Sequence, residues 1–334
     1  MSKKNTRISL IAILFFIAAE LLLRLFGWGP APHVYEEILD PEIQWLHTAG
    51  FKGRVWETDI EISPQRIRDR IYSINKPKYT FRVIAVGECT VFGRAVALEE
   101  SFVKRLEVLL NERKPFKNIN DYEVINAGCG QYNDLQKEAF LEKYWMRYNP
   151  DLIIFGHDLG SKVWLETRLK LRWFSLIRDR TPKQLYSARF LVSLIERFII
   201  APVALKMSHY DEKNTVLTRY TGEGLRHIKT DQALKRLSLL SRKTDVPAII
   251  VFVPWLGDLS EGSYPHKWVH ELYKKKCAKS NLDVLDLYDV YFKNKQCDLF
   301  WVSDANRRPN ALAHKIIAEE VYQEIVKRAS LPKK

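Results

Sequence analysis

The sequence has no internal repeat and no low-complexity tract over its 334 residues, which excludes a repeat array and argues against a disordered chain. Hydrophobic residues make up 46% of the chain and aromatic residues 12%, which is enough to bury a full core. We therefore expect one large folded domain, or two small ones, after an N-terminal segment.

Cysteine is scarce, with four residues in the whole chain. In an oxidising compartment this even number allows two disulfides, in three possible pairings. Cys277 and Cys297 are candidates for one bridge.

Acidic residues are also in deficit, since 40 Asp and Glu face 53 Lys and Arg. The resulting net charge of +13 indicates an acidic partner surface. Charge alone leaves anionic lipid, acidic polysaccharide and nucleic acid open.

Long apolar runs are absent except near the N-terminus. There, Ile8 to Trp28 is long enough to cross a bilayer about 30 Å thick at about 1.5 Å per residue. Glu20 and Arg24 interrupt the run four residues apart, a spacing that lets them compensate each other's charge. No clean small-x-small cleavage site follows, which favours an uncleaved anchor over a cleaved signal peptide.

Basic residues precede this run and acidic residues follow it, so the positive-inside rule predicts a cytoplasmic N-terminus. We therefore predict a single-pass protein of the bacterial inner membrane whose C-terminal part is periplasmic or extracellular. This topology disfavours nucleic acid as a partner. The predicted parts are an anchor (1–28), a lead-in or linker (29–78) and a main domain (79–330).

Short apolar runs rich in β-branched residues predict buried parallel strands. They are Phe81–Val86, Tyr122–Asn126, Asp151–Phe155, Val246–Val253 and Leu282–Leu287. Helical patterns lie at 101–113, 133–147, 183–199, 229–244, 265–280 and 310–328. Strands that alternate with helices give a parallel sheet covered on both faces, and ligands bind beyond the carboxyl ends of its strands.

The residues at these strand ends resemble the sequence blocks of SGNH/GDSL hydrolases. Gly87-Glu88-Cys89-Thr90-Val91-Phe92-Gly93 is similar to the family's Gly-Asp-Ser-x-Thr-x-Gly block. The other similar segments, in the family's order, are Val124–Gly128, Pro150–Ile154, Val253-Pro254 and Arg308–His314, and Glu20–Gly27 and Ile67–Asp69 resemble membrane-anchored bacterial members. The resemblance implies a three-layer, flavodoxin-like α/β fold with a parallel five-stranded sheet, preceded by one N-terminal transmembrane helix.

The family's chemistry uses a serine nucleophile, a histidine base held by an aspartate, and an oxyanion hole of two backbone N–H groups and an asparagine. This chain departs from that pattern. Cys89 replaces the serine, and the glycine of the second block aligns with Gln131, or with Gly130 if one residue is deleted.

Two further blocks are also altered. The segment Gly156–Ser161 replaces the Gly-x-Asn-Asp block and puts Gly160 at the asparagine position. Asp304 is retained, but Arg308 stands at the usual position of the catalytic histidine. His314 matches a second histidine of the family, which is not the catalytic one.

Two functions follow from the resemblance. An active protein is an esterase or acyltransferase on acyl (acetyl) esters of cell-surface polysaccharide, with Cys89 as nucleophile, His157 as a substitute base and Asp304 as a third catalytic residue. Its oxyanion and substrate-binding residues are Gly130, Gln131, Gly160 and Arg308. An inert pseudoenzyme binds a glycan or supports a membrane complex, and Asp304 then forms no more than an ion pair with Arg307 or Arg308.

A thiolate is a stronger nucleophile than an alcohol, so Cys89 alone does not exclude activity. However, each oxyanion donor is worth about 3 kcal/mol and a general base about 10²- to 10⁴-fold, so their combined loss favours the inert protein. No metal or cofactor is expected. Cys89 and Cys129 follow neighbouring strands about 4.8 Å apart, which permits a disulfide between them without requiring it.

Residues 162–207 carry ten Lys or Arg against three acidic residues, a net charge of +7, with five Trp and Phe interleaved. Such a basic aromatic insert suits an anionic membrane surface or an acidic glycan. A pair of helices that covers the core with a solvated basic face explains it equally well.

Overall fold

A computed structural model represents the whole chain. It describes residues 3–25, 34–55, 58–159, 191, 194–195, 198, 225–256, 264–292, 297–303 and 306–329. Two predicted site residues, Gly160 and Asp304, lie outside these residues, as does almost all of the basic insert, including most of the helical pattern at 183–199.

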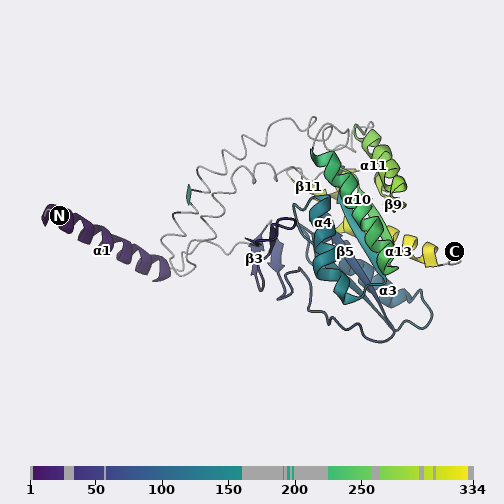
Figure 1. Cartoon of the computed structure of the whole chain (residues 1–334), viewed down its shortest axis with the longest axis horizontal. Helices are drawn as coiled ribbons and strands as arrows, with labels where there is room; N and C mark the ends of the chain where they lie inside the picture. Colours follow the sequence, from purple (N-terminus) through teal and green to yellow (C-terminus); the bar gives the residue numbers. More distant parts are fainter. Residues whose placement is uncertain are drawn as a thin grey trace. The chain divides into compact units, whose positions relative to one another are not determined.

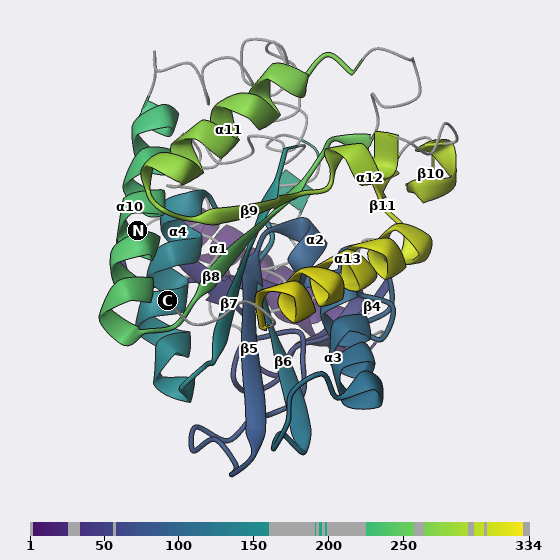
Figure 2. The same ribbon diagram turned by 90° about the vertical axis from the view of Figure 1, so that its right-hand side faces the viewer.

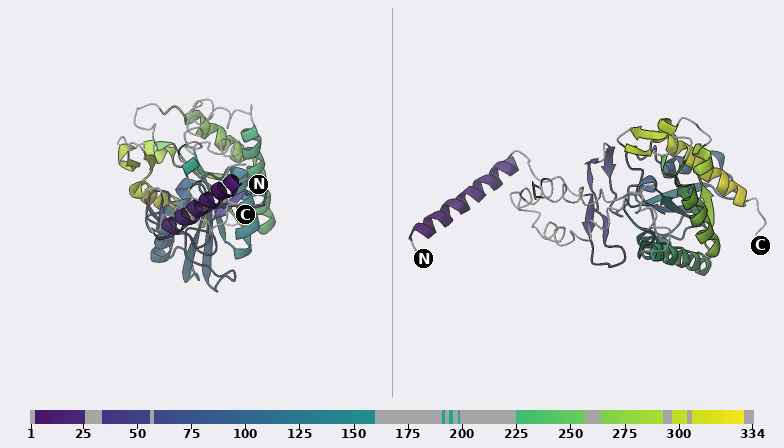
Figure 3. Two further views of the ribbon diagram at one scale, coloured as in Figure 1. Left: turned by 90° about the vertical axis from the view of Figure 1, so that its left-hand side faces the viewer. Right: turned by 90° about the horizontal axis from the view of Figure 1, so that it is seen from above.

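The chain divides into two compact units, and the first comprises residues 1–37 and 163–212. It contains helix α1 (Lys3–Leu25), drawn as one unbroken helix in Figures 1 and 3, and strand β1 (Tyr35–Glu37). The predicted ion pair within the apolar run is confirmed, because Arg24 Nη2 lies 2.8 Å from Glu20 Oε1. In the part of the chain that the structure describes, no helix is long and apolar enough to span a bilayer, and the membrane span stays a prediction.

The second unit, residues 38–162 and 213–334, is built on a five-stranded sheet. Its strands, in spatial order, are β6 (Asp121–Gly128), β5 (Thr80–Gly87), β7 (Leu152–Asp158), β8 (Ala248–Val253) and β9 (Asp283–Asp286) (Figure 2). Every neighbouring pair is parallel. This is the flavodoxin-like order 2-1-3-4-5, so the predicted α/β class and parallel five-stranded sheet are confirmed.

Helices cover both faces of the sheet, which is why its strands are apolar on both sides. Figure 2 shows α3 and α13 on one face and α4, α10 and α11 on the other. Their bounds are α3 (Phe102–Arg113), α4 (Asp134–Phe140), α10 (Leu225–Thr244), α11 (Lys267–Lys279), and α13 (Ala311–Ala329). A short helix, α2 (Cys89–Phe92), follows β5, and α12 (Tyr288–Phe292) follows β9.

Side-chain caps explain where two of these helices begin. The Ser101 hydroxyl accepts from the backbone N–H of Lys104 at the start of α3. Asn133 and Gln136 form a reciprocal capping box at the start of α4, which satisfies two backbone donors that would otherwise be unpaired. The helix that begins there continues as a π turn (Leu141–Trp145) and a 3₁₀ turn (Met146–Tyr148).

The segment predicted as a lead-in is packed into the second unit from Ile38 onward. It contains β2 (Trp45–His47) and the hairpin β3 (Lys52–Val55) and β4 (Thr58–Glu61). Tyr132 donates its hydroxyl to the Trp45 carbonyl and Gln136 donates to the Ile43 carbonyl, which ties this segment to the start of α4. A second hairpin, β10 (Trp301–Ser303) and β11 (Asn306–Pro309), follows the turn Cys297–Phe300 and precedes α13.

Candidate functional site

Cys89 is the first residue of α2, directly beyond the carboxyl end of β5, and is 8% exposed. Helix α2 packs directly against the backbone of Gly128 at the end of β6, because a Cβ built on Gly128 would lie 2.3 Å from the Phe92 nitrogen. The turn ends at Gly93, whose φ of 76° is left-handed. The strand, turn and short helix therefore place Cys89 at the carboxyl end of the sheet, the edge at which ligands of parallel α/β sheets bind.

The two residues that align with the glycine of the second sequence block, Gly130 and Gln131, differ in backbone conformation. Gln131 has a left-handed φ of 72°, whereas Gly130 has no positive φ. Gln131 therefore has the backbone conformation that normally favours glycine, whereas Gly130 does not. Within the described residues its side-chain Oε1 is buried and has no hydrogen-bond partner.

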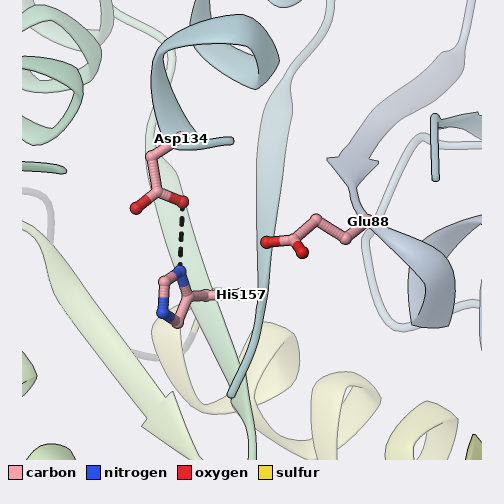
Figure 4. Close-up of side chains that lie close together, drawn as sticks. All are labelled: Glu88, Asp134 and His157. Atoms are coloured by element: carbon pink, nitrogen blue, oxygen red, sulfur yellow. Dashed lines mark hydrogen bonds and ion pairs between the residues drawn. The ribbon is translucent and has the colours of Figure 1, made fainter. Parts of the chain in front are cut away.

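A buried cluster of charged side chains lies beneath this turn and consists of Glu88, Asp134, Lys137 and His157. Figure 4 shows the Glu88 carboxyl group and the His157 ring pointing toward the Asp134 side chain. The side chains of all four are at most 1% exposed. Thr230 on α10 donates to the second oxygen of Asp134 at 2.9 Å, so α4, β7, α10 and the β5–α2 junction meet here.

Three of these side chains have metal-ligand spacing, because ligand atoms of Glu88, Asp134 and His157 lie within 4.8 Å of one another. The Lys137 Nζ, however, lies 2.6 Å from Asp134 Oδ1 and 3.2 Å from Glu88 Oε1, and donates to the Gly156 carbonyl at 3.0 Å. A buried ammonium thus supplies the positive charge that the carboxylates require. The arrangement fits an internal ion-pair network better than a metal centre.

His157 was expected on the rim beside Cys89, but β7 continues to Asp158 and includes it. His157 pairs with Phe252 of β8, and its Nδ1 lies 3.1 Å from Asp134 Oδ1. Its ring stacks on Tyr273 with centroids 4.1 Å apart, and it is fully buried. Residues that alternate along a strand face opposite sides of the sheet, and a Cβ on Gly156 would meet Val91 of α2. The imidazole therefore points to the face opposite α2.

Asp158, the next residue, points toward α2. Its Oδ2 accepts from the backbone N–H of Thr90 at 3.0 Å. Burial, and then the nearby Glu88 charge, raise the pKa of Asp158 to about 6. A carboxyl group thus meets the amino end of the helix that begins with Cys89.

Two residues singled out in the last sequence block, Arg308 and His314, lie in the part of the chain that the structure describes. Arg308 lies half-buried in β11, next to the start of α13. His314 is fully buried on α13, where its Nδ1 accepts from the Phe102 backbone N–H at 3.1 Å, and burial lowers its pKa to about 3. His314 therefore ties α13 to the start of α3, consistent with the expectation that it is not the catalytic histidine.

Cys89, Cys129 and Cys277 are buried, and none of the three forms a disulfide. The predicted Cys277–Cys297 bridge is therefore wrong: Cys277 lies on the buried face of α11, where burial raises the pKa of its thiol. The bridge between Cys89 and Cys129, which the sequence left open, is not formed. Cys129 is held near the end of β5 by its backbone N–H, which donates to the Gly87 carbonyl at 2.9 Å.

Sequence reasoning missed Lys137 and Asp134. The available signal was their three-residue spacing on a predicted helix, which places an acid and a base on one face. It also missed a hydrogen-bonded chain at the ends of β8 and β9. There, Tyr264 Oη lies 3.3 Å from His270 Nε2, and His270 Nδ1 lies 2.8 Å from Asp286 Oδ1. Trp255 N donates to the Tyr264 hydroxyl, so this chain fixes the backbone after β8.

No family model matches the chain, and no curated protein matches its sequence. Several solved structures are similar. A two-domain esterase active on acetylated mannans is 12% identical with a TM-score of 0.43; the match covers 76% of this chain and 51% of that one, so this chain spans about half its length. An acetyl xylan esterase is 14% identical with a TM-score of 0.47, covering 73% and 100%. A lipase/acylhydrolase from Enterococcus faecalis is 13% identical with a TM-score of 0.42, covering 76% and 99%.

At such identities the likeness concerns the fold alone. The resemblance of this chain to the SGNH/GDSL hydrolases rests on its sequence blocks, and the observed strand order agrees with the fold that this resemblance implies.

Proposed function

We propose that this chain is an SGNH/GDSL hydrolase-like extracytoplasmic protein whose ligand is an acyl (acetyl) ester of a cell-surface polysaccharide. In this proposal the protein binds the ester and does not hydrolyse it through a nucleophile–histidine–aspartate triad. The ligand class comes from the family that the sequence blocks resemble. Similar folds with acetyl xylan and acetylated mannan esterase activity agree with that class.

The position of His157 carries the proposal that hydrolysis is lost. His157 lies within β7, where it is paired to Asp134 and stacked on Tyr273 on the face opposite α2. The resemblance puts Arg308 at the family's histidine position, and a guanidinium has five N–H donors and no acceptor, so it cannot take a proton from residue 89. Without a base the family mechanism loses about 10²- to 10⁴-fold in rate.

A second candidate function is a Cys89-dependent esterase or acyltransferase. One observation favours it: the Cys89 thiol is free and stands at the nucleophile position of the turn. A thiolate needs less help from a base than a serine does. In this alternative, Asp304, Gly130, Gln131, Gly160 and Arg308 would line the reacting ester.

We further propose that α1 anchors the protein in the inner membrane with the second unit in the periplasm or outside the cell. Support comes from the side chains of Leu14, Phe15, Phe16, Ile17, Leu21, Leu22 and Leu25, which are large, apolar and exposed on the helix. Such a surface is costly in water and favourable in lipid. The basic insert 162–207 is the proposed contact with acidic glycan or anionic lipid.

The binding proposal is tested with acetylated xylan and with the same xylan after chemical deacetylation. The full chain in detergent should be retained by the acetylated polymer more strongly than by the deacetylated one, and should release no acetate from it. Equal retention by the two polymers would reject the ester as the ligand. Release of acetate that disappears in a Cys89→Ala variant would replace the binding proposal with the enzymatic one.

A further inference from the structure

Helix α2 has four residues, far fewer than the ~12 that an isolated helix needs to be stable in water. Its position must therefore come from contacts with the rest of the domain. Two buried charged side chains from distant segments meet its two ends, and these are Asp158 and Arg68.

Arg68 lies at the carboxyl end. Its guanidinium donates to the carbonyls of Phe92 at 3.3 Å, Gly93 at 2.5 Å and Val96 at 2.9 Å, and to the Asp59 carbonyl at 3.4 Å. The residue is 1% exposed, and among the described residues no carboxylate lies within ion-pair distance of it. Burial of this cation is therefore compensated by four backbone carbonyls, two of which, those of Phe92 and Gly93, lie at the carboxyl end of α2.

Asp158 lies at the amino end, where its Oδ2 accepts from the Thr90 N–H at 3.0 Å and the residue is 7% exposed. A negative group at the amino end and a positive group at the carboxyl end is the arrangement that a helix dipole favours. The two contacts span the whole of the helix that begins with Cys89.

We infer that Arg68 and Asp158 are positioning residues that together hold α2, and with it residue 89, at the carboxyl edge of the sheet. The inference rests on the proposed function only in naming residue 89 as the position that a ligand meets. Arg68 lies in the segment 29–78, which the sequence predicted to be a lead-in or linker, so this segment helps to position the residues of the site.

The rate at which Cys89 is alkylated under native conditions reports how often α2 opens. The full chain in detergent is treated with iodoacetamide, and labelling of each cysteine is followed by peptide mass spectrometry. Cys277 is fully buried on α11, away from α2, and is the internal control in the same sample. This readout does not depend on ester hydrolysis or binding, so it can fail while the proposed function holds, and the reverse.

Arg68→Lys replaces the two donating nitrogens of the guanidinium with one ammonium that cannot reach all four carbonyls, so it should speed Cys89 labelling about tenfold or more relative to Cys277. Arg82→Lys is the matched control, because Arg82 is also fully buried but pairs with Glu123 at the opposite end of β5. It should leave the Cys89 to Cys277 ratio unchanged. Equal acceleration of both cysteines in Arg68→Lys, or an equal change of the ratio in Arg82→Lys, would overturn the role of Arg68.

Asp158 is tested by variants that keep Arg68. These variants also test the inference if Arg68→Lys does not fold. Asp158→Ala loses the acceptor for the Thr90 N–H and should raise the Cys89 to Cys277 ratio. Asp158→Asn keeps an amide oxygen there and should restore a ratio close to wild type. If alanine leaves the ratio unchanged, α2 is held without Asp158 and the inference is wrong.

Discussion

The Lys137 Nζ lies 2.6 Å from Asp134 Oδ1, and both side chains are at most 1% exposed. Glu88 and the Gly156 carbonyl complete the surroundings of this ammonium. The pair joins α4 to the end of β5 and to β7, immediately beneath the turn that carries Cys89.

Replacing Lys137 with Met should destabilise the domain by about 3–5 kcal/mol, because it leaves two carboxylates buried without their cation. Urea unfolding of the full chain in detergent measures this change. The exposed pair of Lys52 and Glu61, with side chains 71% and 68% exposed, supplies the control: Lys52→Ala should leave the midpoint nearly unchanged. A Lys137→Met variant as stable as wild type would mean that the cluster is uncharged.

Asp158 should give the domain a pH dependence of known sign. Its pKa is about 6 in the folded protein and 3.8 as the ordinary value, so between these limits the folded state keeps a proton that the unfolded state releases. Stability from this group therefore falls as pH rises from about 4 to about 6 and then levels off. Compared with Asp158→Asn, the wild type should lose stability over that window in urea titrations. A constant difference between the two proteins from pH 4 to 7 would contradict the raised pKa.

His314 should act in the opposite direction. Burial lowers its pKa from 6.5 to about 3, so the unfolded state takes up a proton that the folded state does not. Its stabilising contribution is present above pH 6.5 and is lost as pH falls toward 3. His314→Asn, which retains an acceptor for the Phe102 N–H, should be less acid-sensitive in thermal unfolding between pH 7 and 5. An identical slope for both proteins would show that His314 can be protonated in the folded state.

The cysteines should be reduced in the native protein. Labelling with a thiol reagent under denaturing, non-reducing conditions should modify Cys89, Cys129 and Cys277, since none of the three forms a disulfide. A sample purified without reductant from the membrane fraction is the relevant one. Protection of both Cys89 and Cys129 that disappears on reduction would reveal a disulfide and remove the nucleophile from the second candidate function.

The sheet could be predicted because its central strands β5, β7 and β8 contain continuous apolar runs, and such runs indicate strands that are buried on both faces. The end of β7 could not, since His157 and Asp158 are polar and were expected to follow the strand rather than continue it. Their burial depends on Asp134 and Thr90, which lie 23 and 68 residues away in the chain. The role of Arg68 was hidden for the same reason, because its acceptors are backbone carbonyls and carry no sequence signal.

Hydrolysis of an aryl acetate by the full chain tests the central claim, that ester hydrolysis through residue 89 is lost. Wild-type protein and Cys89→Ala are compared in the same detergent, at equal concentration, with an active acetyl esterase as the assay control. Because no imidazole faces Cys89 from β7 and Arg308 replaces the family's histidine, the two proteins should hydrolyse the ester at the same rate, without a burst. A burst of about one product per protein molecule that Cys89→Ala abolishes would contradict the account.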